Sequence, residues 1–242
     1  MTQPTIPWLL SPNDFPVTSQ ALRYPPGLLA ASQHISADWL MQSYPRGIFP
    51  WYSHGEPVLW WSTSPRAVLY LEEFKLHRSL RKTIRRQTQD KSRRITLNMA
   101  FEQVMRACAE PRPGQDGTWI TEDVLSAYCE LHQRGHAHSV EHWHEGQLVG
   151  GLYCVAFGQM VYGESMFAKQ TDASKVAFAH WVYWLKAQNV RIMDCQQATS
   201  HLMSFGARTI SRETFEYEMA QAVIQPGLTW QPCELKWTHD ST

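Results

Sequence analysis

The chain has 242 residues, 43% of them hydrophobic, and its 22 basic and 22 acidic side chains give a formal net charge of zero. This length allows a sizeable core, and the balanced charge means that any polyanion must be bound by a local basic patch. Five widely spaced cysteines without a C-x-x-C pair argue against a disulfide framework, and we find neither a signal peptide nor an apolar run of about 18 residues. We therefore expect a cytoplasmic protein that is not inserted in a membrane.

Residues 1–65 are rich in proline and aromatic side chains, which predicts a small, irregular subdomain. One helix is predicted there, at 36–44, because Ser36 can cap its start and Pro45 prevents its continuation. From residue 66 onward, strand patterns alternate with helix patterns. The predicted strands are 67–70, 95–97, 138–143, 148–157, 160–164 and 190–193, and the predicted helices are 78–86, 100–109, one capped by Thr121 and one opened by Asp172 and Ser174.

Hairpins accompany this alternation, as at the predicted turn of Glu145 and Gly146. Hairpins together with helices between strands predict a mixed sheet with helices packed on it. We expect an α+β (mixed α/β) fold with a Pro/Trp-rich N-terminal subdomain at 1–65 and a larger domain at 66–242.

Positive charge is concentrated in residues 78–94, where Asp90 is the one acidic residue. Basic side chains recur there at three- and four-residue spacing, so on a helix they share a face. Such a face can bind a phosphate backbone without reading its sequence, although a solvated basic helix has the same pattern. The candidate phosphate-binding side chains are Arg78, Arg81, Lys82, Arg85 and Arg86.

Two polar segments stand at the ends of apolar strands. Glu164, in the run GESMF, could hold an amine beside an apolar pocket, or it could be a carboxylate that faces solvent. Asp194 and Gln196 follow a predicted central strand, and ligands bind at the carboxyl ends of such strands in open α/β sheets. These three side chains are the candidate polar centre.

Two other readings of the polar residues are weaker. Cys195 could pair with His201 as a nucleophile, but strand alternation sends Asp194 and Gln196 to one face and Cys195 to the other, which favours a small buried residue. A metal site is not favoured, because no cysteine or carboxylate stands at a recognised ligand spacing from the histidines at 132, 136, 138, 142 and 144. The chain also lacks the glycine-rich phosphate loops of nucleotide-binding enzymes, and we expect no cofactor.

Ten blocks, in this order, resemble the leucyl/phenylalanyl-tRNA–protein transferase family along nearly the whole chain. Runs such as GIFPW and GESMF are specific to that family. The blocks are 26–30 (PGLLA), 44–51 (YPRGIFPW), 59–68 (LWWSTSPRAV), 117–120 (GTWI), 135–141 (GHAHSVE), 148–153 (LVGGLY), 163–167 (GESMF), 172–175 (DASK), 194–196 (DCQ) and 201–207 (HLMSFGA).

The resemblance implies a larger domain similar to the GCN5-related acetyltransferase fold. It also implies transfer of Leu or Phe, with Met as a further candidate, from aminoacyl-tRNA to proteins that begin with Arg or Lys, in the N-end rule of protein degradation. Trp51, Trp119 and Met166 would line the pocket for the transferred side chain. Further pocket positions, where this chain differs in type from a well-known member, are Leu152, Val161 and Trp181.

By the same resemblance, Glu164 and Gln196 form the polar centre and Asp194 orients Gln196. We expect direct aminolysis of the ester, in which Gln196 accepts a hydrogen bond from the incoming amine. Two alternatives remain open: an acyl-CoA-dependent N-acyltransferase of similar fold, and a tRNA-binding module without catalytic activity. The first would need a pyrophosphate loop that the sequence lacks, and the second leaves the tryptophans and the polar centre without a role.

Overall fold

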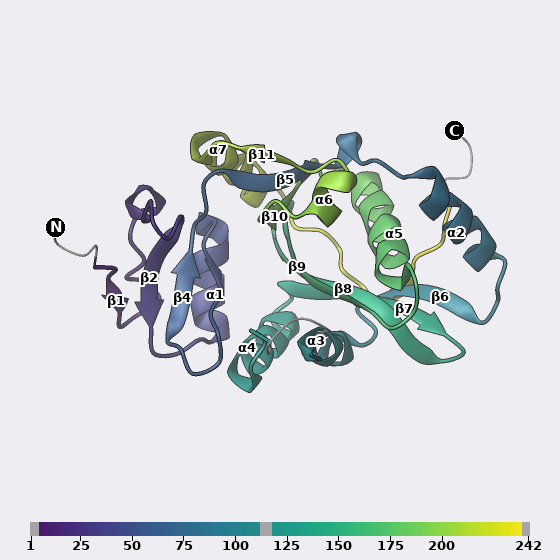
Figure 1. Cartoon of the computed structure of the whole chain (residues 1–242), viewed down its shortest axis with the longest axis horizontal. Coiled ribbons are helices and arrows are strands. Elements are labelled where there is room, and N and C mark those ends of the chain that lie inside the picture. The colour runs from purple at the N-terminus through teal and green to yellow at the C-terminus, as the bar shows by residue number, and fades with distance from the viewer. Residues whose placement is uncertain (1–4, 112–117, 239–242) are drawn as a thin grey trace.

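Two β-sheets form the framework of the computed structural model, which describes residues 5–111 and 118–238. The smaller sheet lies at one end of the molecule, with α1 (Ala37–Ser43) beside it (Figure 1). Trp39 of α1 stacks on Trp60 of the sheet, with ring centroids 5.7 Å apart. In spatial order its strands are β1 (Trp8–Leu9), β2 (Leu28–Ser32), β4 (Val58–Trp61) and β3 (Phe49–Pro50).

The larger sheet has eight strands. Adjacent strands in it are antiparallel, except for β9 and β10, which are parallel. It runs through the rest of the molecule (Figure 1). In spatial order its strands are β11 (Arg208–Ile210), β5 (Arg66–Tyr70), β10 (Ile192–Gln196), β9 (Met160–Ala168), β8 (Gln147–Phe157), β7 (Ala137–His144), β6 (Arg93–Leu97) and β12 (Cys233–Glu234).

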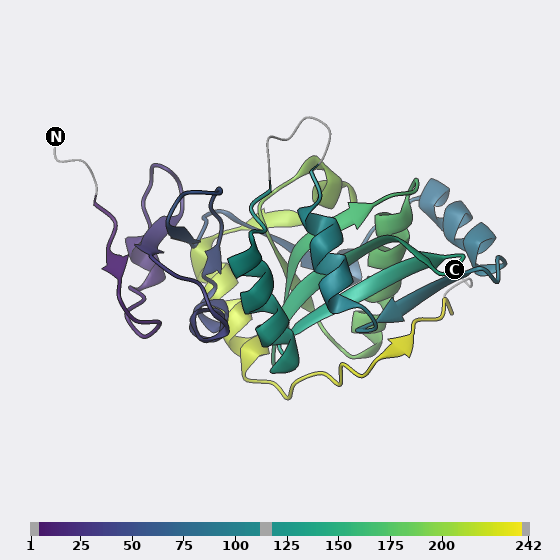
Figure 2. The same ribbon diagram turned by 90° about the horizontal axis from the view of Figure 1, so that it is seen from below.

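Helices cover both faces of the large sheet. One face carries α3 (Phe101–Ala109) and α4 (Glu122–Gln133), and the other carries α5 (Ala173–Ala187), with α2 (Arg78–Thr88) beyond it (Figure 1). The smaller helices and the last helix follow β10 and β11 as α6 (Ser200–Ser204) and α7 (Arg212–Val223). After α7 the chain returns along the large sheet to β12 at its far edge (Figure 2).

The connection β9–α5–β10 determines where the sheet opens. Gly150 of β8 lets the start of α5 lie against the sheet, because a Cβ atom at Gly150 would stand 2.6 Å from that of Ala173. The parallel pairing of β9 with β10 comprises two residue pairs, which join Val161 and Tyr162 to β10. Beyond these pairs the carboxyl ends of the two strands are free to line a cavity.

The predicted fold class is confirmed: a mixed sheet is flanked by helices, and the first part of the chain forms a smaller unit. The predicted helices and strands from residue 66 onward are present, with β9 longer than expected and β10 beginning two residues later. The first 65 residues are more regular than predicted, since they contain a four-stranded sheet. The division at residue 65 stays a prediction, because one hydrophobic core includes side chains from both sides of it.

Candidate active site

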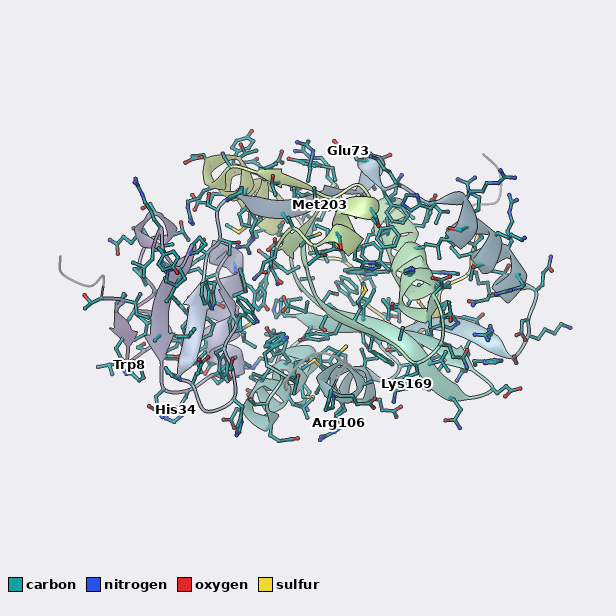
Figure 3. The ribbon with its side chains drawn as sticks, viewed as in Figure 1. Trp8, His34, Glu73, Arg106, Lys169 and Met203 are labelled. Atoms are coloured by element: carbon teal, nitrogen blue, oxygen red, sulfur yellow. The ribbon has the colours of Figure 1, made fainter. Side chains whose placement is uncertain are left out.

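A cavity of about 730 Å³ opens where β9 and β10 part. Its walls come from β3, β8, β9, β10, α5 and α6 and from the ends of the chain stretch that connects α3 with α4. Figure 3 labels Lys169, just beyond β9, in the lower part of the view and Met203, on α6, in the upper part. Lys169 lines the mouth of the cavity and pairs there with Glu110, at 2.7 Å from Nζ to Oε1.

Both residues of the predicted polar centre that reach the cavity stand at β-bulges. In the pairing of β8 with β9, Tyr153 faces Ser165 and Cys154 faces Gly163, so Glu164 is the extra residue. In the pairing of β10 with β5, the register shifts between Asp194 and Gln196. A bulge re-aims side chains, and bulges are common beside active sites. Here the two bulges turn Glu164 and Gln196 toward each other.

Glu164 is the centre of a buried hydrogen-bond network. Its Oε1 accepts from Nε2 of Gln196 at 2.8 Å, and its Oε2 accepts from the hydroxyl of Tyr128 at 3.4 Å. The hydroxyls of Tyr128 and Tyr44 are 2.5 Å apart. Burial raises the pKa of the Glu164 carboxyl to about 7 and raises the pKa values of both tyrosines well above 10. Near neutral pH the tyrosines are therefore donors, and Glu164 can take up or release a proton.

Asp194 lies behind this network and not in the cavity. Its carboxylate is fully buried and accepts from Nε and Nη2 of Arg66 at 2.8 and 2.6 Å. Its Oδ1 also accepts from the backbone N–H of Gln196 at 2.8 Å. Asp194 thus contacts Gln196 through the backbone N–H, while the side chain of Gln196 donates to Glu164. The register shift between Asp194 and Gln196 accompanies this contact.

The buried ion pair is held between aromatic rings. The Arg66 guanidinium carbon lies 4.7 Å from the ring centroid of Phe49 and 4.6 Å from that of Phe215. Removing one partner of such a pair costs about 3–5 kcal/mol, because a charge is left buried and unpaired. The pair therefore fixes the carboxyl end of β10 against the small sheet and α7.

Most of the predicted side-chain pocket is assembled. Five of the predicted positions line the cavity: Trp51, Trp119, Met166, Leu152 and Trp181. Trp51 is 45% exposed at the cavity edge, and Leu152 and Trp181 are buried in its wall. Val161 is a correction: it is fully buried in the core and does not line the cavity, because it lies on the part of β9 that is still paired with β10. Gly117, which begins the block GTWI, lies outside the described residues.

Cys195 is buried, as predicted, and it lines the cavity next to Gln196. Burial raises its thiol pKa far above the ordinary value, so no thiolate forms near neutral pH. The expected separation of Cys195 from Gln196 on opposite faces does not hold, again because of the bulge. His201 also lines the cavity, and burial lowers the pKa of its imidazole. The geometry does not present Cys195 as a nucleophile.

The basic helix α2 lies at the end of the molecule opposite the small sheet (Figure 1), and it packs on α5, which lines the cavity. Its buried side chains are Leu80 and Ile84, which pack it on the domain. The structure thus keeps the predicted phosphate-binding residues apart from the polar centre. Their exposure varies: Arg81 is half-buried, and the exposed ones are Arg78, Lys82, Arg85 and Arg86.

Sequence reasoning missed Arg66, Tyr44 and Tyr128. Tyr44 and Arg66 lie within the blocks YPRGIFPW and LWWSTSPRAV, but nothing in either block names a partner. Tyr128 lies on the helix that Thr121 caps, and nothing in that stretch of sequence names a partner for its hydroxyl. A signal was present for Arg66, since a single arginine that opens the apolar strand RAVLY needs a buried partner.

Comparison with known proteins decides the family. A family model described as leucyl/phenylalanyl-tRNA protein transferase matches residues 68–220, and the model of the N-terminal domain of that family matches residues 33–64. The chain belongs to the leucyl/phenylalanyl-tRNA protein transferase family. It is therefore an aminoacyltransferase, as the sequence blocks predicted.

Full-length relatives in this family agree. A leucyl/phenylalanyl-tRNA–protein transferase of Chromobacterium violaceum is 50% identical over 239 residues, which cover 98% of this chain and 100% of the relative. One of Burkholderia vietnamiensis is 51% identical and covers 93% of this chain and 91% of its own. A solved structure titled as L-PGS from Bacillus licheniformis matches 71% of this chain and 54% of its own, at 13% identity and a TM-score of 0.36. Within the described residues, no helix is long and apolar enough to cross a membrane.

Proposed function

We propose that this protein transfers Leu or Phe, and more weakly Met, from aminoacyl-tRNA to the α-amino group of proteins that begin with Arg or Lys. The observation that carries the proposal is the hydrogen bond between Gln196 and Glu164 at the edge of an apolar, tryptophan-lined cavity. A cytoplasmic role in marking proteins for degradation by the N-end rule follows from that reaction.

The amino acid on tRNA is already an activated ester, so positioning contributes much of the catalysis. An α-amino group has a pKa of about 8, and roughly a tenth of it is the free nucleophile at pH 7. Because Gln196 donates an Nε2 hydrogen to Glu164, its Oε1 is left to accept an N–H of that amine. Holding the amine about 3 Å from the ester carbonyl contributes several kcal/mol, up to ~7–11 in ideal cases.

Proton balance gives Glu164 a second part in the reaction. The amine nitrogen forms a bond to the ester carbonyl carbon, and the bond from that carbon to the ribose oxygen breaks. The ammonium centre so formed loses a proton, and the ribose oxygen gains one as it leaves as a hydroxyl. A carboxylate whose pKa is about 7 can accept the first proton and supply the second. No covalent enzyme intermediate is needed.

The cavity selects the transferred side chain. Trp51, Trp119 and Met166 offer flat or flexible apolar walls that suit Leu and Phe. A difference of one methylene in such a pocket is worth only ~1–3 kcal/mol, so Met is expected to be a poorer substrate but not an excluded one.

Transfer is tested with tRNA that carries radiolabelled leucine, a protein with N-terminal Arg, and the same protein with N-terminal Gly. We expect label on the Arg protein alone, and none after the tRNA has been treated with RNase. An acyl-CoA-dependent activity would instead label the acceptor from radiolabelled acyl-CoA without tRNA. No transfer from tRNA, despite salt-sensitive tRNA binding, would overturn the proposal in favour of a binding module.

The basic helix is expected to hold the tRNA by its phosphates. Replacing Arg78, Lys82 and Arg86 with glutamine should raise KM for aminoacyl-tRNA and leave kcat unchanged, because α2 is remote from the polar centre. Each lost phosphate contact should reduce the slope of log affinity against log salt by about 0.7–0.9. The measurement is KM at several salt concentrations.

A matched control for these changes is available on the other face of the sheet. Arg106 and Arg134 are exposed arginines on α3 and just after α4, and each is paired with a glutamate. Replacing both with glutamine should leave KM and the salt slope unchanged. An equal effect of the two sets would mean that overall charge, and not α2, determines tRNA affinity.

A further inference from the structure

The backbone at Gln196 is held in a conformation that non-glycine residues seldom adopt. Its φ is 57°, in the left-handed region, which persists only where surrounding contacts hold it. Two such contacts are present: the N–H of Gln196 donates to Asp194 Oδ1 at 2.8 Å, and its carbonyl oxygen accepts from the hydroxyl of Thr63 at 3.2 Å. From this backbone conformation the side chain of Gln196 reaches Glu164, with Nε2 2.8 Å from Oε1.

The acceptor in the first contact is itself fixed by Arg66. Asp194 is fully buried, so water does not orient its carboxylate. Arg66 binds both carboxylate oxygens, in the two-pronged geometry that a guanidinium provides and an ammonium does not. The guanidinium in turn lies between the rings of Phe49 and Phe215, so its plane is fixed too.

We propose that Arg66 is a positioning residue for transfer: through Asp194 it holds the Gln196 backbone so that the Gln196 amide meets Glu164 in the cavity. The inference rests on the proposed function of Gln196 and Glu164. It also links two parts of the cavity, because Phe49 lines the cavity wall and packs on the same guanidinium. Movement of the small sheet would therefore reach Gln196 through Arg66.

Two variants test the proposal. Arg66→Lys keeps a charge beside Asp194 but cannot bind both of its oxygens. The double variant Arg66→Met with Asp194→Asn removes both charges, so no unpaired charge is buried. It keeps an acceptor oxygen near Gln196 but lacks the two hydrogen bonds from Arg66 that fix its position. In each variant we expect kcat to fall about 100-fold, the size expected from a displacement of about 1 Å, and KM for aminoacyl-tRNA to stay unchanged.

A second readout reports directly on the proposed link. In the ¹⁵N-labelled protein, the backbone amide resonance of Gln196 should shift, and its hydrogen exchange should become faster, in both variants. Arg46→Met is the matched control: Arg46 donates to the carbonyls of Phe15 and Pro16 and lies over the Phe15 ring, none of which lines the cavity. It should lower the melting temperature without changing kcat or the Gln196 resonance.

The outcomes separate clearly. A loss of kcat with a shifted Gln196 resonance supports the proposal. Unchanged kcat in either folded variant, or lost kcat with an unshifted resonance, overturns it. If the wild-type protein transfers no amino acid from tRNA, the proposed function fails, and the Gln196 resonance still decides whether Arg66 and Asp194 hold that backbone.

Discussion

Gln196→Ala is expected to lower kcat about 10²–10³-fold, the size of effect seen when one positioned hydrogen-bonding group is removed from an active site. The amide of Gln196 is proposed to aim the attacking amine, and alanine leaves nothing in its place. The KM for aminoacyl-tRNA should change little, because the apolar walls and α2 are untouched. Single-turnover transfer at saturating aminoacyl-tRNA measures the effect.

The pH profile distinguishes this role from a general disturbance. The hydrogen bond from Gln196 lowers the pKa of Glu164, in opposition to the larger effect of burial. Without it the Glu164 carboxyl should titrate above pH 7, and the rise of activity with pH should shift to higher pH. Gln133→Ala, at the exposed end of α4, should change neither kcat nor the profile. Wild-type kcat in Gln196→Ala would remove Gln196 from the mechanism.

Local patterns predicted the parts of the fold that local chemistry determines. Val104, Met105 and Cys108 recur at helical spacing, and all three are buried on α3. Thr121 caps α4 as predicted, with its side chain accepting from the N–H of Val124. In both cases the signal, a residue spacing or a cap, involves residues a few positions apart, so the sequence contains it.

The small sheet was not predicted, because the contacts that form it are not local in the sequence. Its strands have two to five residues, and β2 is almost entirely buried, so no alternation of polar and apolar residues marks it as a strand. Its stability comes from packing with distant segments, such as Trp39 on Trp60. Composition alone therefore predicted an irregular segment.

The polar centre shows where prediction from pattern ends. Glu164, Asp194 and Gln196 were identified together, but their mutual geometry depends on two bulges that no residue type announces. Strand alternation placed Asp194 beside the Gln196 side chain, and each extra residue reverses such an assignment. The partner of Asp194, Arg66, lies 128 positions away in the sequence. Only the folded chain brings the two together.

Glu164→Gln is expected to abolish most activity and to stabilise the folded protein at the same time. Glutamine cannot accept the proton of the attacking amine, so kcat should fall about 10²–10⁴-fold, the usual contribution of general acid–base catalysis. In the wild type the rate should rise with pH up to about 7, as the carboxyl ionises. The variant should lose that rise and keep only the dependence that comes from the amine, near pH 8.

Stability should change in the opposite direction, with a pH dependence of definite sign. The folded-state pKa of Glu164 is raised from 4.5 to about 7, so between these values the folded state binds more protons than the unfolded state. Ionisation therefore costs the wild type stability that is lost progressively from pH 4.5 to 7, up to ~3 kcal/mol. Glutamine stays neutral, so the variant should melt higher than the wild type at pH 8 and the difference should vanish near pH 4.

Melting curves at several pH values test this, with Glu213→Gln as a control, since Glu213 is an exposed carboxylate whose pKa is lowered by the hydroxyl of Ser211. The Glu213→Gln change should not raise the melting temperature at any of these pH values. A wild-type level of transfer in Glu164→Gln would exclude the carboxylate as proton acceptor. Equal melting temperatures at pH 8 would mean that its ionisation costs nothing in the fold. Reduced activity together with raised stability would show that the buried carboxylate is kept for the reaction and not for the fold.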